Sequence, residues 1–389
     1  MIRLLLCDGD GSILFDQDLN QTKNLINYLD RSAIVLGVVT NNYTGEIERN
    51  FIERGLRRPD LIISRYSIGE RKPSPAFIEE ATKITGFKRN EIAYIGDDDF
   101  TDALCALNSS VLPLTAMYSN SGKSMNYGLP MNSIDDLIEF IDWYGKQPEP
   151  FFGWQCNVPE KKILTYSLIG QHKQIGLTQP LQRIFKFDEE VVSSRNNVSL
   201  STVILYYLIS QIFLSGLIKH VDVVTVYPGS QIGKVNHLLA DYSRMFKKIF
   251  IKRSYYEDLL IRHTSAKKST NTSGDKREII DQLSTVHVNP KYEDLIQKKK
   301  ILVLDDFTTS GNSLETSRIL LLKAGCSTVT SIAIAKYRNS YNFSTVLKDD
   351  WDPFSPLTIT KEEIVTTPIN GFFNKTADDY LQNNILNHY

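Results

Sequence analysis

The sequence has few cysteines, few histidines and no excess of either charge. Its four cysteines, Cys7, Cys105, Cys156 and Cys326, lie far apart with no paired spacing, which argues against a disulfide framework or a zinc site and favours a reducing cytoplasm. The six histidines show no metal-ligand spacing. A formal net charge of -1 gives the whole chain no attraction to nucleic acid or to anionic membranes, so any such affinity must come from a local patch.

Long apolar runs are also scarce. The first run is interrupted by Asp8 and is too short for a signal peptide. The stretch 200–218 carries no charge and approaches the length of a membrane span. It contains five serine, threonine and glutamine residues, however, and leads into a strand-like segment at 221–227. We therefore predict a buried helix, no membrane partner and a cytoplasmic location.

The length of 389 residues exceeds what one ordinary core accommodates, so two domains are expected. Apolar strands alternate with amphipathic helices in residues 1–145, which predicts an α/β domain with a doubly wound parallel sheet. The same alternation in residues 155–342 predicts a second such sheet, with a hood around 155–220. The tail 343–389 gives mixed signals and stays unassigned.

Polar and charged side chains gather at the expected strand ends of the first half. Since the carboxyl ends of parallel strands share one edge of a sheet, these side chains should lie close together. They are Asp8, Asp10, Thr40, Asn41, Lys72, Asp97, Asp98 and Asp102.

The chemistry of this set is coherent for phosphoryl transfer. Asp8 can attack phosphorus, and Asp10 can protonate the leaving oxygen. Asp97 and Asp8 offer the hard oxygen ligands that Mg²⁺ prefers. Thr40 and Lys72 can neutralise the phosphoryl group during transfer.

This pattern resembles the four motifs of haloacid dehalogenase-type (HAD) phosphatases over about residues 1–140. The resemblance implies a HAD-like Rossmannoid fold and an aspartyl-phosphate on Asp8. It also implies a set of assigned roles: Asp10 as general acid and base, Thr40, Asn41 and Lys72 as phosphate ligands, Asp8, Asp10, Asp97 and Asp98 as Mg²⁺ ligands, and Asp102 as the second acid of the last motif.

The spacing of the motifs leaves no room for the cap domain of family members that act on small metabolites. Only about thirty residues separate Asp10 from Thr40, and about as many separate Thr40 from Lys72. The site is therefore expected either to be open to a large substrate, such as a nucleic-acid end or a protein, or to be roofed by the second domain.

A second acidic cluster follows the apolar run 301–304. Asp305 and Asp306 can accept hydrogen bonds from ribose hydroxyls and favour the positive charge that develops on the sugar as pyrophosphate leaves. A loop of small polar residues then opens a helix whose N–H groups can bind a phosphate. The loop consists of Thr308, Thr309, Ser310, Gly311, Asn312 and Ser313.

The stretch resembles the phosphoribosyl pyrophosphate (PRPP) signature of type I phosphoribosyltransferases, with the spacing of the ComF-like branch. The resemblance implies that Asp305 and Asp306 are catalytic and that the loop binds the donor, PRPP or a nucleotide. It places the pyrophosphate loop at Pro228, Gly229 and Ser230, and a basic flexible loop around Lys276 and Arg277. The usual arginine-rich run is replaced by residues 230–239, which leaves the acceptor open.

The two patterns together predict a bifunctional nucleotide enzyme. It would transfer phosphoribose from PRPP with Mg²⁺ and hydrolyse a phosphomonoester through an aspartyl-phosphate. Two alternatives stay open: a regulatory protein that senses PRPP or a nucleotide, and a bacterial defence or toxin effector that acts on nucleic acid or nucleotide pools. The acceptor, the phosphatase substrate and the oligomeric state also stay open.

Overall fold

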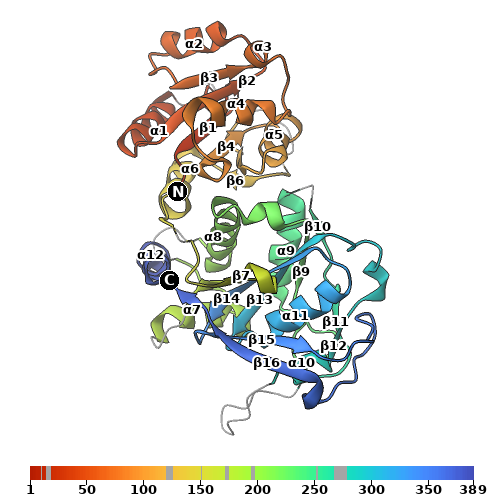
Figure 1. The fold of residues 1–389 in the computed structure, drawn as a ribbon. Helices are drawn as coiled ribbons and strands as arrows, with labels where there is room; N and C mark the ends of the chain where they lie inside the picture. The colour runs from red at the N-terminus through yellow and green to blue at the C-terminus, as the bar shows by residue number, and fades with distance from the viewer. Residues whose placement is uncertain are drawn as a thin grey trace. The chain divides into compact units, whose positions relative to one another are not determined.

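The computed structural model describes residues 1–9, 11–14, 19–119, 126–149, 151–170, 175–193, 198–250, 253–266 and 278–389. The chain divides into two compact units (Figure 1). Unit 1 comprises Met1–Glu149, Tyr206–Lys219 and Lys248–Ile251, and unit 2 comprises Pro150–Leu205, His220–Lys247 and Lys252–Tyr389. The domain limits expected from the sequence stay predictions.

Unit 1 is built on a six-stranded sheet in the order β3-β2-β1-β4-β5-β6, and every neighbouring pair is parallel. The central strand β1 is buried along its whole length, as its apolar sequence requires. The parallel α/β architecture expected for this half is thus confirmed. The strands are β1 (Leu4–Asp8), β2 (Val35–Thr40), β3 (Leu61–Ser64), β4 (Ile92–Gly96), β5 (Leu112–Ala116) and β6 (Leu129–Met131).

The helices of unit 1 are amphipathic and bury one face. In α1 the buried residues Thr22, Leu25, Ile26 and Leu29 recur at spacings of three and four, which places them on one side of a helix. The helices are α1 (Leu19–Arg31), α2 (Thr44–Glu53), α3 (Arg65–Ile68), α4 (Ala76–Thr85), α5 (Leu104–Asn108) and α6 (Ile134–Phe140), with 3₁₀ turn η1 (Arg89–Glu91) and π-helical turns η2 (Asp99–Ala103) and η3 (Ile141–Gly145).

Unit 2 contains a seven-stranded sheet in the order β10-β9-β13-β14-β8-β7-β17. The first five strands are parallel to their neighbours, whereas β7 and β17 pair antiparallel at one edge. A parallel core with an antiparallel edge is common in large α/β sheets. The strands are β7 (Trp154–Val158), β8 (Ile163–Ile169), β9 (Val223–Val226), β10 (Ser254–Tyr255), β13 (Lys300–Thr308), β14 (Thr328–Lys336) and β17 (Phe372–Phe373). A separate two-stranded antiparallel sheet pairs β11 (Leu260–Arg262) with β12 (Val286–Val288).

The apolar run 301–304 suggests a strand that ends near Asp305, but strand β13 extends beyond this residue. It continues through the acid pair to Thr308, because β14 runs on to Lys336 and keeps the parallel ladder going. Asp305 pairs with Ala333 and Thr308 pairs with Lys336 in this register. The two acids therefore lie within a strand, and the loop that opens the next helix begins after Thr308.

The uncharged stretch 200–218 forms a helix, as predicted. Helix α8 spans Leu200–Leu214, and η5 (Leu217–His220) follows it. Among the described residues, no helix has both the length and the apolar character needed to cross a membrane. The other helical elements of this half are α7 (Ile175–Lys186), α9 (His237–Ile249), α10 (Ile279–Leu283), α11 (Asn312–Lys323), α12 (Lys375–Asn384) and the short turns η4 (Pro159–Lys161), η6 (Pro290–Tyr292), η7 (Lys361–Glu363) and η8 (Leu386–His388).

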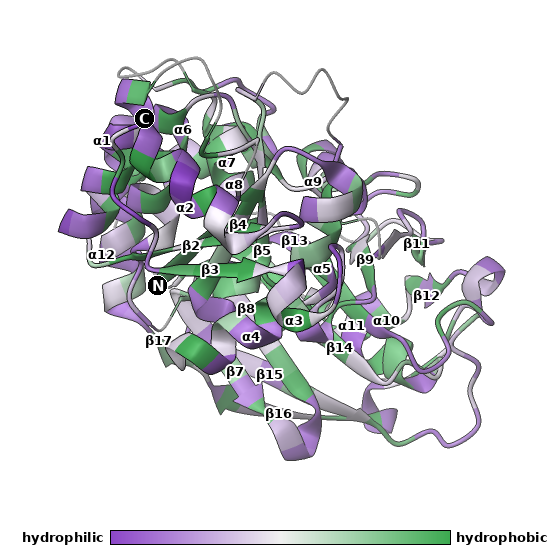
Figure 2. Cartoon of the chain, turned by 90° about the horizontal axis from the view of Figure 1, so that it is seen from above, coloured by the Kyte–Doolittle hydropathy of each residue, from purple (hydrophilic) through white to green (hydrophobic). Residues whose placement is uncertain are grey.

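The tail that the sequence left unassigned is an integral part of unit 2. Its strand β16 (Ile364–Asn370) pairs antiparallel with β15 (Ser340–Val346) along the whole length of both strands. Further on, β17 joins the sheet edge at β7, and the buried Asp378 of α12 accepts a hydrogen bond from the Gly170 amide at 2.8 Å. In Figure 2 the apolar residues concentrate in the strands, and polar ones in the outer helices and loops.

A buried ion pair provides a test of how unit 2 is held together. The fully buried Glu315 accepts two hydrogen bonds from Arg318, at 2.6 and 2.7 Å, and others from the Tyr341 hydroxyl and the Ser344 amide. Because Glu315→Ala leaves Arg318 without its carboxylate, we expect unit 2 to lose about 3 kcal/mol of unfolding free energy in a denaturant titration. Arg244→Ala, which breaks an exposed pair with Glu257, should cost less than about 1 kcal/mol. Equal losses for the two variants would contradict this account.

Candidate active sites

The first candidate site lies where β1, β2 and β4 end. Asp8 is the last residue of β1, Thr40 is the last residue of β2, and Asp97 follows β4. Asp8 and Thr40 are buried, and the Thr40 hydroxyl accepts a hydrogen bond from the Asn42 amide at 2.9 Å. The predicted gathering of these side chains at one sheet edge is therefore seen in the structure, while their roles stay predictions.

Lys72 joins this cluster from the loop before α4. Its ammonium group forms ion pairs with one oxygen of Asp8 and, at 2.5 Å, with one oxygen of Asp102. The Lys72 amide donates to Asn41 Oδ1 at 3.1 Å, and the Tyr94 hydroxyl donates to Asp102 at 3.0 Å. All three members of the charged group are less than a tenth exposed, so the ion pairs are shielded from water.

Burial shapes the electrostatics of these groups. For Asp102, burial and repulsion from Asp8 raise the pKa to about 7 against the opposing attraction of Lys72. Burial lowers the pKa of Lys72, but the attraction of Asp8 and Asp102 outweighs that effect and leaves its pKa above the usual value. The lysine thus keeps its positive charge in the protein interior, where it pairs with both carboxylates.

Three carboxylates, those of Asp8, Asp97 and Asp102, each place a ligand oxygen within 4.8 Å of the others. Such a set fits a hard divalent cation such as Mg²⁺. Asp97 packs so closely against Gly11 that a Cβ there would lie 2.1 Å from its carboxylate, so the position requires glycine. The predicted ligand Asp10 lies outside the described residues.

The adjacent acids of the last motif have separate tasks. Asp98 accepts hydrogen bonds from the Phe100 and Thr101 amides and so caps the helical turn η2. Asp99 accepts from the Asn126 and Tyr127 amides at 2.7 and 3.0 Å. Asp98 stays a predicted metal ligand, but the geometry favours Asp102 as the third carboxylate of the cluster.

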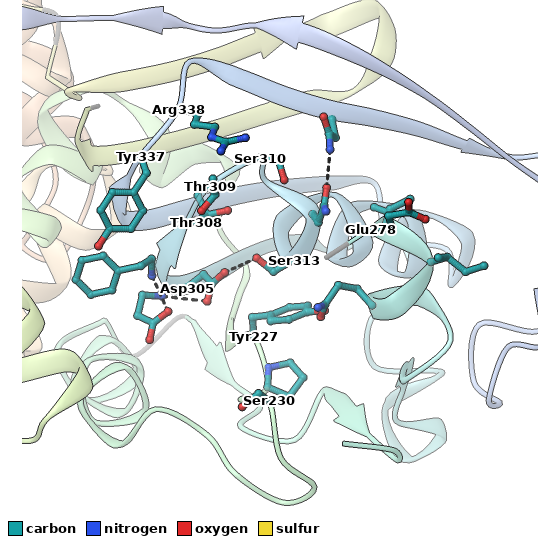
Figure 3. A pocket seen from close by; sticks show the side chains of 18 of the residues that line it. Tyr227, Ser230, Glu278, Asp305, Thr308, Thr309, Ser310, Ser313, Tyr337 and Arg338 are labelled. Atoms are coloured by element: carbon teal, nitrogen blue, oxygen red, sulfur yellow. Dashed lines mark hydrogen bonds between the residues drawn. The ribbon is translucent and has the colours of Figure 1, made fainter. Parts of the chain in front are cut away.

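The second candidate site is a cavity of about 1320 Å³ in unit 2. Figure 3 shows Asp305 and Ser313 joined by a hydrogen bond, with Tyr227 and Ser230 on one side and Thr308, Thr309 and Ser310 on the other. The lining contains most of the predicted donor-binding residues: Pro228, Gly229, Ser230, Asp305, Asp306, Thr308, Thr309, Ser310, Asn312 and Ser313. Lys276 and Arg277 lie outside the described residues.

The acid pair is held by neutral donors. Asp305 accepts from the Ser313 hydroxyl at 2.5 Å and from the Asp306 amide at 3.0 Å. Asp306 accepts from the Phe307 amide at 2.6 Å and from the Asn236 side chain at 3.3 Å. Burial, with repulsion from Asp306, raises the pKa of Asp305 to about 7, and burial also raises the pKa of Asp306. A cation or hydroxyl donors bound in the cavity would therefore stabilise the negative charge of the pair.

Contacts with residues of β14 and β15 fix the loop after β13. Gly311 has a φ of 80°, and a Cβ there would meet the Tyr341 ring at 2.5 Å, which explains the glycine. The Asn342 amide donates to the Ser310 carbonyl at 2.8 Å. The buried Lys336 ammonium donates to the Thr309 carbonyl at 2.5 Å, and burial lowers its pKa to about 7.

Several lining residues were not identified from the sequence. Arg262 is buried and donates to the Gly229 carbonyl at 2.5 Å and to Gln282 at 2.9 Å, so it fixes the turn predicted to bind pyrophosphate. An arginine directly after the apolar segment 259–261 was the signal that could have revealed it. The tail contributes further residues that carried no local signal, namely Lys361, Ile364 and Thr366, and Asn342 lies directly before it.

The family comparison concerns unit 1. Residues 17–115 match the haloacid dehalogenase-like hydrolase family and form a hydrolase domain of that kind. The matched segment contains Thr40, Lys72, Asp97 and Asp102 and begins after Asp8. A search of the curated proteins finds no match.

Solved structures with similar segments are only distantly alike. An uncharacterized protein from Listeria monocytogenes serotype 4b is 12% identical, with 36% of this chain and 96% of that chain covered and a TM-score of 0.30. A HAD phosphatase from Thermococcus onnurineus is 18% identical, with 31% and 56% covered and a TM-score of 0.29. A Had-superfamily hydrolase from Ehrlichia chaffeensis is 22% identical, with 34% and 63% covered and a TM-score of 0.28. The chain thus spans little more than half the length of the last two.

The raised pKa of Asp305 predicts how stability depends on pH. Its folded-state pKa of about 7 lies above the ordinary value of 3.8, so this group stabilises the fold at low pH and loses that contribution as pH rises toward 7. We expect Asp305→Asn, without divalent cations, to be more stable than the natural protein by about 2 kcal/mol at pH 8 and by much less at pH 4.5. Denaturant titrations at both pH values measure this, with the exposed Asp350→Asn as control. A pH-independent difference would disprove it.

Proposed function

We propose that unit 1 is a magnesium-dependent phosphomonoesterase in which Asp8 is the nucleophile. One observation carries the proposal: the buried Lys72 ammonium contacts both Asp8 and Asp102 at the carboxyl edge of the sheet. The hydrolase family match of residues 17–115 supports it. A fixed positive charge beside a buried carboxylate is what attack on an anionic phosphoryl group requires.

The reaction has two steps. An Asp8 oxygen forms a bond to phosphorus while the bond from phosphorus to the ester oxygen breaks, and the leaving oxygen takes a proton from Asp10 in its predicted role. Water then attacks phosphorus, the bond from phosphorus to Asp8 breaks, and Asp10 takes the proton of the water. Lys72 offsets the negative charge of the phosphoryl oxygens in both steps.

The carboxylate cluster names the residues that would hold Mg²⁺. Asp8, Asp97 and Asp102 form the group whose oxygens lie within 4.8 Å, and Asp10 and Asp98 are the further ligands expected from the sequence. When bound, the ion supplies electrostatic stabilisation for the charge that builds up on the phosphoryl oxygens.

Removal of the nucleophile is the direct test. With glycerol phosphate as substrate and Mg²⁺ present, we expect Asp8→Asn to lower kcat by roughly 10³-fold or more, because no covalent intermediate can form. Release of inorganic phosphate measures the rate. Glu80→Gln, a charge change on the surface of α4, should leave it unaltered. Activity in Asp8→Asn equal to that in Glu80→Gln would refute the proposal.

For unit 2 we propose binding and transfer of phosphoribose from PRPP. The observation that favours this second function is that the acid pair, the loop 308–313 and the turn 228–230 line one cavity. The loop opens α11, so its amides and hydroxyls can hold a 5′-phosphate, while Asp305 and Asp306 can accept the ribose hydroxyls. A volume of about 1320 Å³ leaves space for an acceptor beside the donor.

In the transfer, the acceptor forms a bond to C1 of the ribose while the bond from C1 to the pyrophosphate oxygen breaks. Pyrophosphate leaves with the electron pair, and the acceptor loses its proton to solvent. The 5′-phosphate that remains on the product is a phosphomonoester, which is the class of substrate proposed for unit 1. The two activities would then act in sequence on one molecule.

Pyrophosphate release distinguishes the functions open to unit 2. The protein is incubated with Mg²⁺, PRPP and mixtures of nucleobases or nucleic acids, and Asp305→Asn and Asp306→Asn serve as inactive comparisons. We expect acceptor-dependent release that each variant lowers at least about 100-fold. Tight PRPP binding without release would instead indicate a sensor. Growth arrest on expression that either variant abolishes would indicate a defence or toxin effector.

A further inference from the structure

Two tyrosines of unit 1 are stacked on each other at the surface. The rings of Tyr43 and Tyr66 are parallel to within 5°, with their centroids 3.8 Å apart, although the residues are 60% and 47% exposed. The Arg65 guanidinium lies 4.4 Å from the centre of the Tyr66 ring. Single exposed aromatics are common on protein surfaces, whereas a stacked pair beside a cation forms a flat surface suited to another ring.

The pair is attached to the same loops as the phosphatase site. Tyr43 lies three residues after Thr40 and directly precedes α2. Tyr66 lies two residues after the buried Ser64, whose hydroxyl donates to the Asn42 carbonyl at 2.5 Å and so ties the two loops together. The tyrosines therefore lie beside the carboxyl ends of β2 and β3, next to the edge that carries Thr40.

No inserted domain supplies specificity at this edge in the described part of the chain. Between Thr40 and Lys72 the chain forms only α2, β3 and α3, and between residues 19 and 40 only α1 and β2. Surface residues around the site are therefore available to contact the leaving group. The tyrosine pair is built into that surface by hydrogen bonds of buried groups.

The charged groups that act on the Tyr66 hydroxyl are positive. The hydrogen bond from Arg65 lowers the pKa of this hydroxyl, with smaller contributions from Tyr43 and Arg71, and the Arg65 guanidinium also contacts the ring. Arginine next to exposed aromatic rings is the combination that binds nucleotides, because each base stacks on a ring and each phosphate attracts a cation. Glycerol phosphate, by contrast, has no ring that could stack on the tyrosines.

We propose that the Tyr43–Tyr66 pair, with Arg65 and Arg71, is a base-stacking surface that makes unit 1 select nucleotide phosphomonoesters. The inference rests on the proposed phosphatase function and names its substrate class. A nucleobase would stack on the tyrosine pair while the attached phosphate reaches Asp8 and Lys72. The substrate is either a mononucleotide or the phosphorylated end of a single strand, and both share this chemistry.

The test compares substrates with and without a base. The ratio of kcat/KM for a phosphorylated oligodeoxyadenylate to that for glycerol phosphate is measured in the full-length protein, and adenosine monophosphate is run alongside. Tyr43→Ala and Tyr66→Ala should each lower the ratio by about tenfold, mainly through KM, because stacking on a side chain contributes that much to base binding. Tyr43→Phe and Tyr66→Phe keep the rings and should therefore have the same ratio as the natural protein. The control Ile84→Ala removes an equally exposed apolar side chain from α4 and should leave the ratio unchanged.

The outcomes separate the inference from the function on which it rests. A loss for both nucleotide substrates assigns the surface to mononucleotides, and a loss for the oligonucleotide alone assigns it to strand ends. Ratios in Tyr43→Ala and Tyr66→Ala equal to that of the natural protein would overturn the inference while leaving the phosphatase intact. If no substrate is hydrolysed in an Asp8-dependent way, binding of the oligonucleotide by calorimetry decides: the inference fails if Tyr43→Ala and Tyr66→Ala bind it as tightly as the natural protein.

Discussion

The ammonium group of Lys72 offsets the repulsion that would otherwise separate Asp8 from Asp102 inside unit 1. Both carboxylates are almost inaccessible to water, so neither can be stabilised by hydration. The ion pairs to Lys72 replace that hydration and fix the three side chains with respect to one another. In the proposed phosphatase reaction, a phosphoryl group would become a partner of the lysine, and a cation would become a partner of the carboxylates.

The acid pair of unit 2 meets the same electrostatic problem with a different solution. Asp305 and Asp306 are held by amides and by the hydroxyl of Ser313, which reduce their charge repulsion less than an ammonium group would. Burial raises the pKa of both carboxyls, with repulsion from Asp306 as a further cause for Asp305, so hydrogen bonds to neutral donors leave a deficit of stabilisation. The deficit is an advantage for binding, since ribose hydroxyls, a metal ion or a cationic sugar ring would all lower the energy of the pair. The two sites thus differ in their direct partners, which are an ammonium group for Asp8 and Asp102 but amides and a hydroxyl for Asp305 and Asp306.

Local sequence patterns predicted the structure correctly where the residues of a segment themselves determine its conformation. The apolar runs before Asp8 and Asp305 become buried strands, and Thr40 joins Asp8 because parallel strands end at a common edge, whereas Lys72 reaches Asp8 from the loop before α4. Patterns failed where a distant partner decides. Strand β13 extends to Thr308 only because β14 continues beside it, and Arg262 is identified as a support of the 228–230 turn only by its contact with Gly229.

The adjacent aspartates of unit 1 illustrate the same limit at shorter range. Asp97, Asp98 and Asp99 are chemically identical, and their tasks are set by the helical turn that follows them. Asp98 satisfies amides at the start of that turn, whereas Asp102, four residues on, reaches back to Lys72. The sequence shows that several acids are present, but the geometry of the helical turn determines which of them face the site.

The pairing of β15 with β16 has a consequence for how the protein is made. Ile364 and Thr366 line the cavity of unit 2 but leave the ribosome only after every other lining residue has been synthesised. Asp8, Lys72 and Asp102 lie, by contrast, within the first 102 residues, and the last segment of unit 1, Lys248–Ile251, also precedes β16 in the chain. Because domains fold as units during translation, unit 1 can be completed before β16 is synthesised, whereas the cavity of unit 2 stays open on one side until β16 arrives. Ribosome-bound chains would therefore carry a finished first site beside an unfinished second one.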